Sequence, residues 1–115
     1  MKKVFTITLI IFFYFYSAQA QTGIKGIIKS ENTKEILPYV NIGIIGKGVG
    51  TVSNDNGKFE ISISKKHLRD SLKISMIGYI SQTYLVKDFI RIIEKDNIVY
   101  LQENIEEMTT QKDIL

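Results

Sequence analysis

The sequence predicts an all-β sandwich of six to seven short strands. Apolar and polar residues alternate in several short runs, most clearly where Phe59, Ile61 and Ile63 are separated by polar neighbours. This period of two is typical of a strand with one buried and one solvated face. Turn-forming residues separate the runs at intervals of roughly ten residues, as in β-sandwiches. The helix–strand alternation that predicts a parallel α/β fold is missing.

The first 20 residues are predicted to be an export signal that is cleaved. Met1–Lys3 is basic, residues 4–16 are apolar, and small residues stand at Ala18 and Ala20. This spacing suits a signal peptidase that cuts before Gln21. A retained membrane anchor is disfavoured because thirteen helical residues rise only about 20 Å, against a hydrocarbon core of roughly 30 Å. The sequence has no cysteine, which excludes a bacterial lipoprotein anchor.

The chain after the signal has 95 residues, enough for one domain with its own core. Loss of Lys2 and Lys3 leaves 13 basic against 12 acidic residues, a net charge of +1. A near-neutral surface of mixed charge lacks the basic footprint of a nucleic-acid-binding protein, so no nucleic-acid partner is expected. The lack of cysteine means that export does not imply disulfides here.

Four strands are predicted in the first half of the chain. They cover residues 23–30, 40–44, 49–53 and 58–63. Pro38, the only proline, marks the beginning of the second strand because it has no N–H to give to a sheet. Gly46, Gly48 and Gly50 predict a bend or bulge before the third strand.

The third and fourth strands are predicted to form a hairpin closed by Asn54–Gly57. Asn and Asp side chains can accept hydrogen bonds from the backbone of their own turn, and Gly57 can adopt a positive φ. A calcium loop fits poorly, because aligning Gly57 with the glycine of such a loop puts Val52 and Ile63 where acidic ligands belong. We therefore expect a turn held by Asx hydrogen bonds.

The second half of the chain is predicted to add three strands. They cover residues 72–76, 79–86 and 97–101. Residues 64–70 could form a loop or one turn of helix, and residues 87–95 have apolar residues at helical spacing but could also extend a strand. The chain becomes polar after Leu101. We therefore expect one domain over residues 21–102, followed by a polar tail or linker over residues 103–115.

The sequence offers no catalytic constellation. His67 is the only histidine and is predicted to lie on a surface loop, because charged residues flank it. With one histidine and no cysteine, a structural zinc site is not expected, and no serine lies in a nucleophile elbow. Candidate carboxylates for sugar hydrolysis are Asp55, Glu60, Asp70 and Asp88, but nothing places two of them in one cleft. We expect no enzymatic activity and no catalytic, cofactor-binding or metal-binding residues.

Four motifs follow one another along most of the predicted domain. They are G-I-I-K-S at residues 26–30, L-P-Y-V-N-I at 37–42, G-T-V-S-N-D-N-G-K-F-E-I at 50–61 and L-K-I-S-M-I-G-Y at 72–79. In this order they resemble the carboxypeptidase-like regulatory domain of Bacteroidetes envelope proteins. The resemblance implies a transthyretin-like, Ig-like β-sandwich. One departure is Asn54, where that family usually has Asp, and asparagine keeps the ability to form an Asx turn.

The motif residues are interpreted as folding determinants rather than catalytic groups. They are Pro38, Asn41, Gly50, Thr51, Asn54, Gly57, Phe59, Ser75, Gly78 and Tyr79. Gly57 is expected to close a turn, and Phe59, two residues later, is expected to anchor the following strand in the core. Gly78 is expected to end a strand, and the aromatic ring of Tyr79 is expected to fill the space at this break.

The resemblance implies a non-catalytic accessory or interaction module of the cell envelope. Such domains commonly stand at the N-terminus of TonB-dependent outer-membrane receptors, and others are exported as the only recognisable domain. Residues 101–108 are similar to the segment that leads toward the receptor plug, so we expect either a stand-alone domain or a shortened receptor. The expected location is the periplasm, the outer membrane or the exterior. The expected partner is an envelope protein, docked at sheet edges and loops, for example by strand addition, with no small-molecule cofactor.

Two other functions are compatible with the sequence. A carbohydrate-binding or adhesive module would expose Tyr39 or Tyr79 in a groove, because aromatic rings stack on sugars. A fragment of a metallopeptidase would keep only its accessory domain. This reading needs an upstream catalytic domain, and a signal peptide directly before the sandwich disfavours one.

Overall fold

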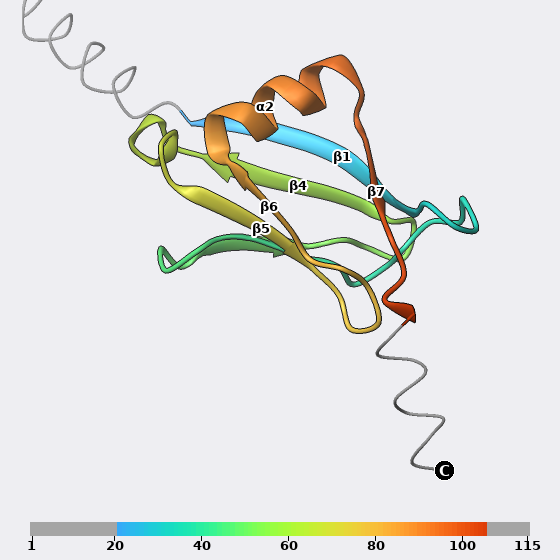
Figure 1. Cartoon of the computed structure of the whole chain (residues 1–115). Coiled ribbons are helices and arrows are strands. Elements are labelled where there is room, and N and C mark those ends of the chain that lie inside the picture. The colour runs from blue at the N-terminus through green and yellow to red at the C-terminus, as the bar shows by residue number, and fades with distance from the viewer. Residues whose placement is uncertain (1–20, 106–115) are drawn as a thin grey trace, which may run out of the picture.

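The computed structural model describes residues 21–105, which form two packed β-sheets (Figure 1). The strands are β1 (Thr22–Ser30), β2 (Asn41–Ile44), β3 (Val49–Val52), β4 (Lys58–Ile63), β5 (Ser71–Ser75), β6 (Gln82–Leu85) and β7 (Ile98–Leu101). A 3₁₀ helix, η1 (Lys65–His67), precedes β5, and an α-helix, α2 (Val86–Lys95), separates β6 from β7. The predicted all-β sandwich is confirmed. The two intervals that the sequence left open, 64–70 and 87–95, contain these two helices.

One sheet has three strands in the order β4-β1-β7, with β1 in the middle. β4 runs antiparallel to β1, whereas β7 runs parallel to it. A parallel neighbour requires a crossover, and here the chain builds the whole second sheet and α2 before it returns as β7. Ile24 and Ile28 of β1 point into the core, while Lys25 stays exposed.

The other sheet has four antiparallel strands in the order β3-β2-β5-β6. β2 and β3 form a tight hairpin through residues 45–48. Gly46 and Gly48 have φ values of +73° and +66° in this turn, a conformation that side chains rarely adopt. The glycines predicted to form a bend or bulge therefore close a hairpin between the second and third strands.

The predicted hairpin between the third and fourth strands is wrong. The Asn54–Gly57 turn is tight, with the Asn54 N–H 2.8 Å from the Lys58 carbonyl oxygen, but β3 pairs with β2 and β4 pairs with β1. Two backbone hydrogen bonds hold β3 and β4 in different sheets. The Ser53 N–H donates to the Val40 carbonyl, which keeps the end of β3 on its own sheet. The Ile28 N–H donates to the Gly57 carbonyl, which starts β4 alongside β1.

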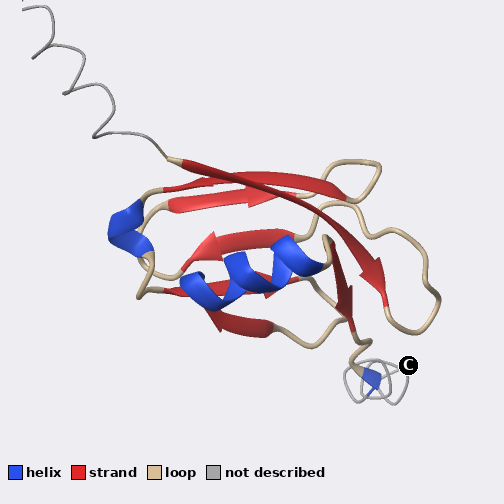
Figure 2. Cartoon of the chain, turned by 90° about the horizontal axis from the view of Figure 1, so that it is seen from above, coloured by secondary structure: helices blue, strands red, loops and turns tan. Residues whose placement is uncertain are grey.

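Helix α2 contacts β1 of one sheet and β5 and β6 of the other (Figures 1 and 2). Val86, Phe89 and Ile93 are its buried residues. Their spacing gives one apolar face, as an amphipathic helix on a core requires. The predicted strand over residues 79–86 is shorter than expected, because Gly78 turns the chain with φ +88° and the helix already begins at Val86.

One apolar core lies between the sheets and under α2. Its fully buried members are Ile28, Val40, Ile42, Ile63, Leu72, Ile74, Val86, Phe89 and Leu101. Within residues 21–105, every buried apolar residue lies between Ile24 and Leu101. A fragment over residues 21–115 therefore contains the complete described core.

The chain remains attached to the sandwich after β7. Glu103 forms a β-bridge with Tyr79, and the Asn104 N–H donates to the Gly78 carbonyl at 2.9 Å. The segment expected as a tail over residues 103–115 thus begins with residues that pair with the domain. Residues 106–115 and the predicted export signal, residues 1–20, lie outside the described residues.

Candidate interaction surface

Ser53 ties the segment that precedes β2 to the end of β3. Its Oγ accepts a hydrogen bond from the Val40 N–H and donates one to the Leu37 carbonyl, both at 2.8 Å. The Ser53 carbonyl also accepts the Tyr39 N–H. These bonds fix the turn at Pro38 and Tyr39, where Tyr39 has φ +62° and its side chain is 64% exposed. Sequence reasoning placed Ser53 only as the last residue of the predicted third strand, because a serine at a strand end carries no signal of burial.

Replacing Ser53 by alanine is expected to lower the free energy of unfolding by about 2 kcal/mol, because the Val40 N–H loses its side-chain acceptor in a buried site. Ser53 is 1% exposed, so water does not replace the hydroxyl. Urea unfolding of residues 21–115 measures the loss. Ser62→Ala on the exposed face of β4 is the matched control and should change stability by less than about 0.5 kcal/mol. Equal losses in the two variants would show that the buried bonds contribute nothing.

The Asn54–Gly57 turn is held by the Asn54 side chain, as predicted. Its Oδ1 accepts the Asn56 and Lys58 N–H groups, each at 3.0 Å. Gly57 has φ +72°. A Cβ built on Gly57 would lie 2.9 Å from the Ile28 carbonyl oxygen, closer than real side chains approach. The glycine is needed both for its conformation and for the space.

Phe59 is the core anchor that follows this turn. It is 4% exposed, and its ring centroid lies 6.2 Å from that of Phe89 on α2. Gly26 of β1 lies directly opposite, and a Cβ there would be 2.6 Å from the Phe59 ring. Gly26 of the first motif therefore leaves the space that the ring of Phe59, in the third motif, occupies.

The remaining motif residues belong to the four-stranded sheet and its loops. Asn41 is paired with both Val52 and Ser75, which places it between β3 and β5. Gly50 lies opposite Gly43, and its Cβ would be 3.1 Å from the Ile42 carbonyl oxygen, so the two strands approach closely. Thr51, next to Gly50, is opposite Ile42, and Tyr79, next to Gly78, packs against the core. The motif residues meet in strand pairs and turns rather than in one cleft.

β3 is a free edge of the four-stranded sheet. Among the described residues it pairs only with β2. The Ser53 N–H points to Val40 of the segment before β2. Because N–H direction alternates along a strand, the N–H groups of Gly50 and Val52 point away from β2. Val52 is 48% exposed, so this edge carries an apolar side chain beside free backbone donors.

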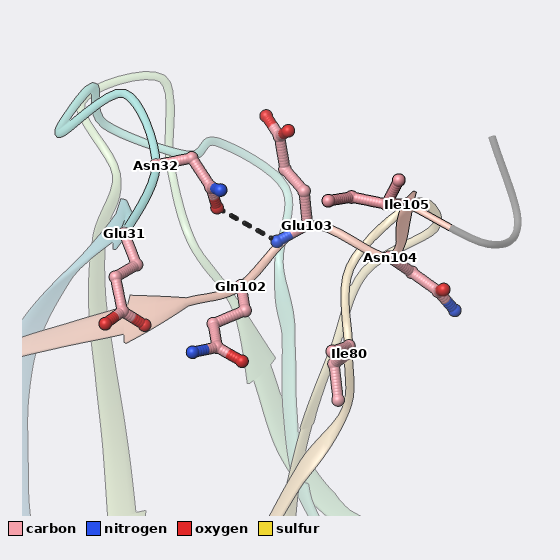
Figure 3. A pocket seen from close by; sticks show the side chains of 7 residues that line it. All are labelled: Glu31, Asn32, Ile80, Gln102, Glu103, Asn104 and Ile105. Carbon is pink, nitrogen blue, oxygen red and sulfur yellow. Dashed lines mark hydrogen bonds between the residues drawn. The ribbon is translucent and has the colours of Figure 1, made fainter. Parts of the chain in front are cut away.

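A groove of about 730 Å³ lies where the described chain leaves the sandwich (Figure 3). Its walls are Glu31, Asn32, Ile80, Gln102, Glu103, Asn104 and Ile105. The Glu103 N–H donates to Asn32 Oδ1 at 3.2 Å and so joins the end of β1 to the end of β7. Ile77, on the loop that pairs with Asn104, is 90% exposed. The lining of the groove is therefore acidic and partly apolar.

The structure does not bring the candidate catalytic groups of the sequence into a metal-binding cluster within the described residues. Within residues 21–105, no group of three or more His, Cys, Asp or Glu is placed to hold a metal ion. The candidate carboxylates Asp55, Glu60, Asp70 and Asp88 lie on a turn, on β4, after η1 and on α2 respectively. No helix in this part of the chain combines the length and the apolar character that a membrane span requires.

The prediction that His67 lies on the surface is wrong. His67 is 9% exposed, and its Nδ1 lies 2.8 Å from Asp70 Oδ2. In a 3₁₀ helix successive residues point about 120° apart, so Lys65 and Lys66 remain exposed while the ring of His67 turns inward. Asp70 satisfies the buried nitrogen. The spacing of three residues between His67 and Asp70 is the signal that sequence reasoning missed.

The pKa values of two tyrosines, Tyr39 and Tyr84, are raised above the usual value. The hydrogen bond from the Tyr39 hydroxyl to Asp55, together with the charge of that carboxylate, raises the pKa of Tyr39. Burial raises the pKa of Tyr84, whose hydroxyl donates to Gln82. Both phenols are therefore neutral at neutral pH, where a catalytic base would need a pKa near 7.

A family model described as the CarboxypepD_reg-like domain matches residues 24–111. The match includes both sheets, α2 and all ten motif residues. No curated protein and no solved structure matches the chain.

Proposed function

Because the chain belongs to the CarboxypepD_reg-like domain family, we propose that it is a non-catalytic interaction module of the cell envelope. The module is exported, loses residues 1–20, and binds a protein partner through β3. A strand of the partner adds to this edge and extends the four-stranded sheet. Main-chain hydrogen bonds supply the affinity, and the side chains beside them supply the specificity.

The observation that carries this proposal is the unpaired edge of β3. Free edge strands are usually protected by charge, proline or a covering segment. The exposed residues of β3 are Gly50 and Val52, which are neither charged nor proline. This edge is thus chemically suited to a strand from another protein.

The larger assembly that we propose is a TonB-dependent outer-membrane receptor, with this domain in front of its plug. The motif order supports this context, as does the attachment of residues 102–104 to the loop at Gly78–Ile80. An antibody to residues 21–115 tests the context in the envelope fraction of the source cells. A product several-fold larger than the 13.2 kDa chain is expected, whereas a product of the domain's own size would contradict the receptor context and leave a stand-alone module.

Strand addition is tested by cross-linking in the same cells. A photo-activatable residue at Val52 should form an adduct with one protein, whereas the same residue at Lys25, on the exposed face of central strand β1, should form none. Val52→Pro removes an N–H that points away from β2 and should abolish co-purification of that protein, while the domain keeps its fold. An adduct at both positions, or full binding by Val52→Pro, would contradict docking at β3.

One observation favours a second function, the binding of carbohydrate. The ring of Tyr39 is 64% exposed and is held in place by Asp55, as a stacking platform for sugars would be. Tyr79 is half-buried against the core, and neither tyrosine lines the groove at the end of β7. Binding of residues 21–115 to a glycan that is lost in Tyr39→Ala but kept in Val52→Pro would establish this alternative.

A further inference from the structure

The charges of the described domain are separated between its two ends. Five exposed cations lie in the loops and the first turn of α2 at the end where β1 begins, namely Lys47, Lys65, Lys66, Arg69 and Lys87. The opposite end carries Glu31, Glu35, Asp55 and Glu103, against Lys29, Lys34 and Lys58, so its charges nearly balance. A nearly neutral chain therefore has one basic end, a name used below for the surface that carries these five cations.

Backbone hydrogen bonds hold the loops of the basic end together. The Ile45 N–H donates to the Ser71 carbonyl at 2.9 Å, which joins the β2–β3 turn to the start of β5. The Val86 and Lys87 N–H groups donate to carbonyls of the segment after η1, which joins the start of α2 to the same place. Figures 1 and 2 show η1 and the start of α2 near the beginning of β1. The cations thus stand on one fixed surface.

Little at this end neutralises the cations. Its carboxylates are Asp70, which is bonded to His67, and Asp88 in the first turn of α2. Within residues 21–105, the ion pair between His67 and Asp70 is the one present, so none of the five cations is paired with a carboxylate. Unpaired lysines and arginines on one surface produce a local positive potential even when the net charge is small.

Two apolar side chains stand among the cations. Ile45, in the β2–β3 turn next to Gly46 and Lys47, is 53% exposed, and Leu85, just before α2, is 41% exposed. Basic residues around an exposed apolar tip suit a bilayer interface, where the apolar group enters the headgroup region and the cations meet phosphates. An acidic protein or a nucleic acid would use the cations but would gain little from Ile45.

We propose that the basic end docks on the surface of an anionic phospholipid bilayer. The docking uses the five cations for attraction and Ile45 for shallow insertion. Cleavage before Gln21 would add an amino-terminal charge at this same end, because Thr22 pairs with Ile63 directly before η1. β3 itself remains free along its length, so this docking does not depend on the partner proposed for β3.

The test is co-sedimentation of residues 21–115 with extruded vesicles. We expect binding to phosphatidylcholine vesicles that contain roughly 30 mol % phosphatidylglycerol, and none to phosphatidylcholine alone. Each basic residue near such a surface contributes roughly fivefold in affinity, so Lys65→Glu with Lys66→Glu should weaken binding at least about tenfold. Ile45→Ser should weaken it by roughly threefold, because less apolar surface leaves water.

The matched control is Lys58→Glu with Lys95→Glu, which changes the net charge equally but away from the basic end. It should bind within about twofold of the unchanged protein, and circular dichroism confirms that all variants fold. Equal weakening by the two double variants would overturn the proposal, as would binding to phosphatidylcholine alone. Preference for soluble poly-glutamate over the anionic vesicles, with no effect of Ile45→Ser, would instead assign the basic end to an acidic protein.

Discussion

Gly57→Ala is expected to lower the free energy of unfolding by about 3 to 4 kcal/mol. An alanine at φ +72° costs about 1–2 kcal/mol for its conformation. Its Cβ would also lie 2.9 Å from the Ile28 carbonyl oxygen and 3.0 Å from the Ile36 side chain, and relieving such overpacking costs about 1–3 kcal/mol. The midpoint and slope of urea unfolding of residues 21–115 give the loss.

Gly46→Ala separates the two causes. Gly46 has φ +73°, nearly the same as Gly57, but nothing lies within 4 Å of a Cβ built there. This variant should lose only about 1 kcal/mol, because the conformational cost is partly offset by a less flexible unfolded chain. If both variants lose the same amount, then crowding at the junction of β1 and β4 plays no part.

Phe59→Ala is expected to lower the free energy of unfolding by about 3–5 kcal/mol, the usual range for deleting a buried aromatic ring. The cavity would be hard to fill, because the opposing residue is Gly26, which has no side chain to move in. The ring also contacts Phe89, which belongs to α2, so the loss should loosen the helix as well as β4. Urea unfolding followed by far-ultraviolet circular dichroism measures it.

Ile77→Ala is the control for this deletion. Ile77 is 90% exposed, so its removal should change stability by less than about 0.5 kcal/mol. A loss of under about 1 kcal/mol in Phe59→Ala would contradict its assignment as a core anchor. Since a domain of this size has a stability of only about 5–15 kcal/mol, either Phe59→Ala or Gly57→Ala removes a large part of it.

These expectations explain why a family signature is poor evidence for a site in this chain. Gly26, Gly57 and Phe59 fit β4 and its preceding turn against β1 and α2, and all three are buried. The proposed contacts are made elsewhere, at Val52 on the edge of β3 and at the cations of the basic end. A sequence motif of buried residues identifies the fold, while exposed residues carry the interaction.

Several elements were predictable because their signals are local. The alternation in Lys58–Ile63 follows from the two faces of a strand, and the structure buries Phe59, Ile61 and Ile63. The Asx turn at Asn54 depends on atoms within four residues. The helix over Val86–Lys95 was left open between helix and strand, because a short segment of apolar residues fits both periods.

The wrong predictions concern contacts between distant parts of the chain. The sequence suggested that β3 and β4 pair because they adjoin, but a backbone ladder has no sequence code for its partner. Ser53 and Gly57 decide the outcome through bonds to Val40 and Ile28, which are more than ten residues away. His67 was placed in solvent by its charged neighbours, whereas its burial depends on which side of η1 faces the core.

The sequence by itself therefore determined the class of the fold, the buried face of each clear strand, the Asx turn and the family. These follow from hydrophobic periodicity and turn chemistry, which act over a few residues. Only the tertiary structure decided which strands pair, that β3 is an open edge, and that five cations from two connections and the first turn of α2 share one end. These features arise because the chain crosses between two sheets, and the positions of loops in space depend on that path rather than on their order in the sequence.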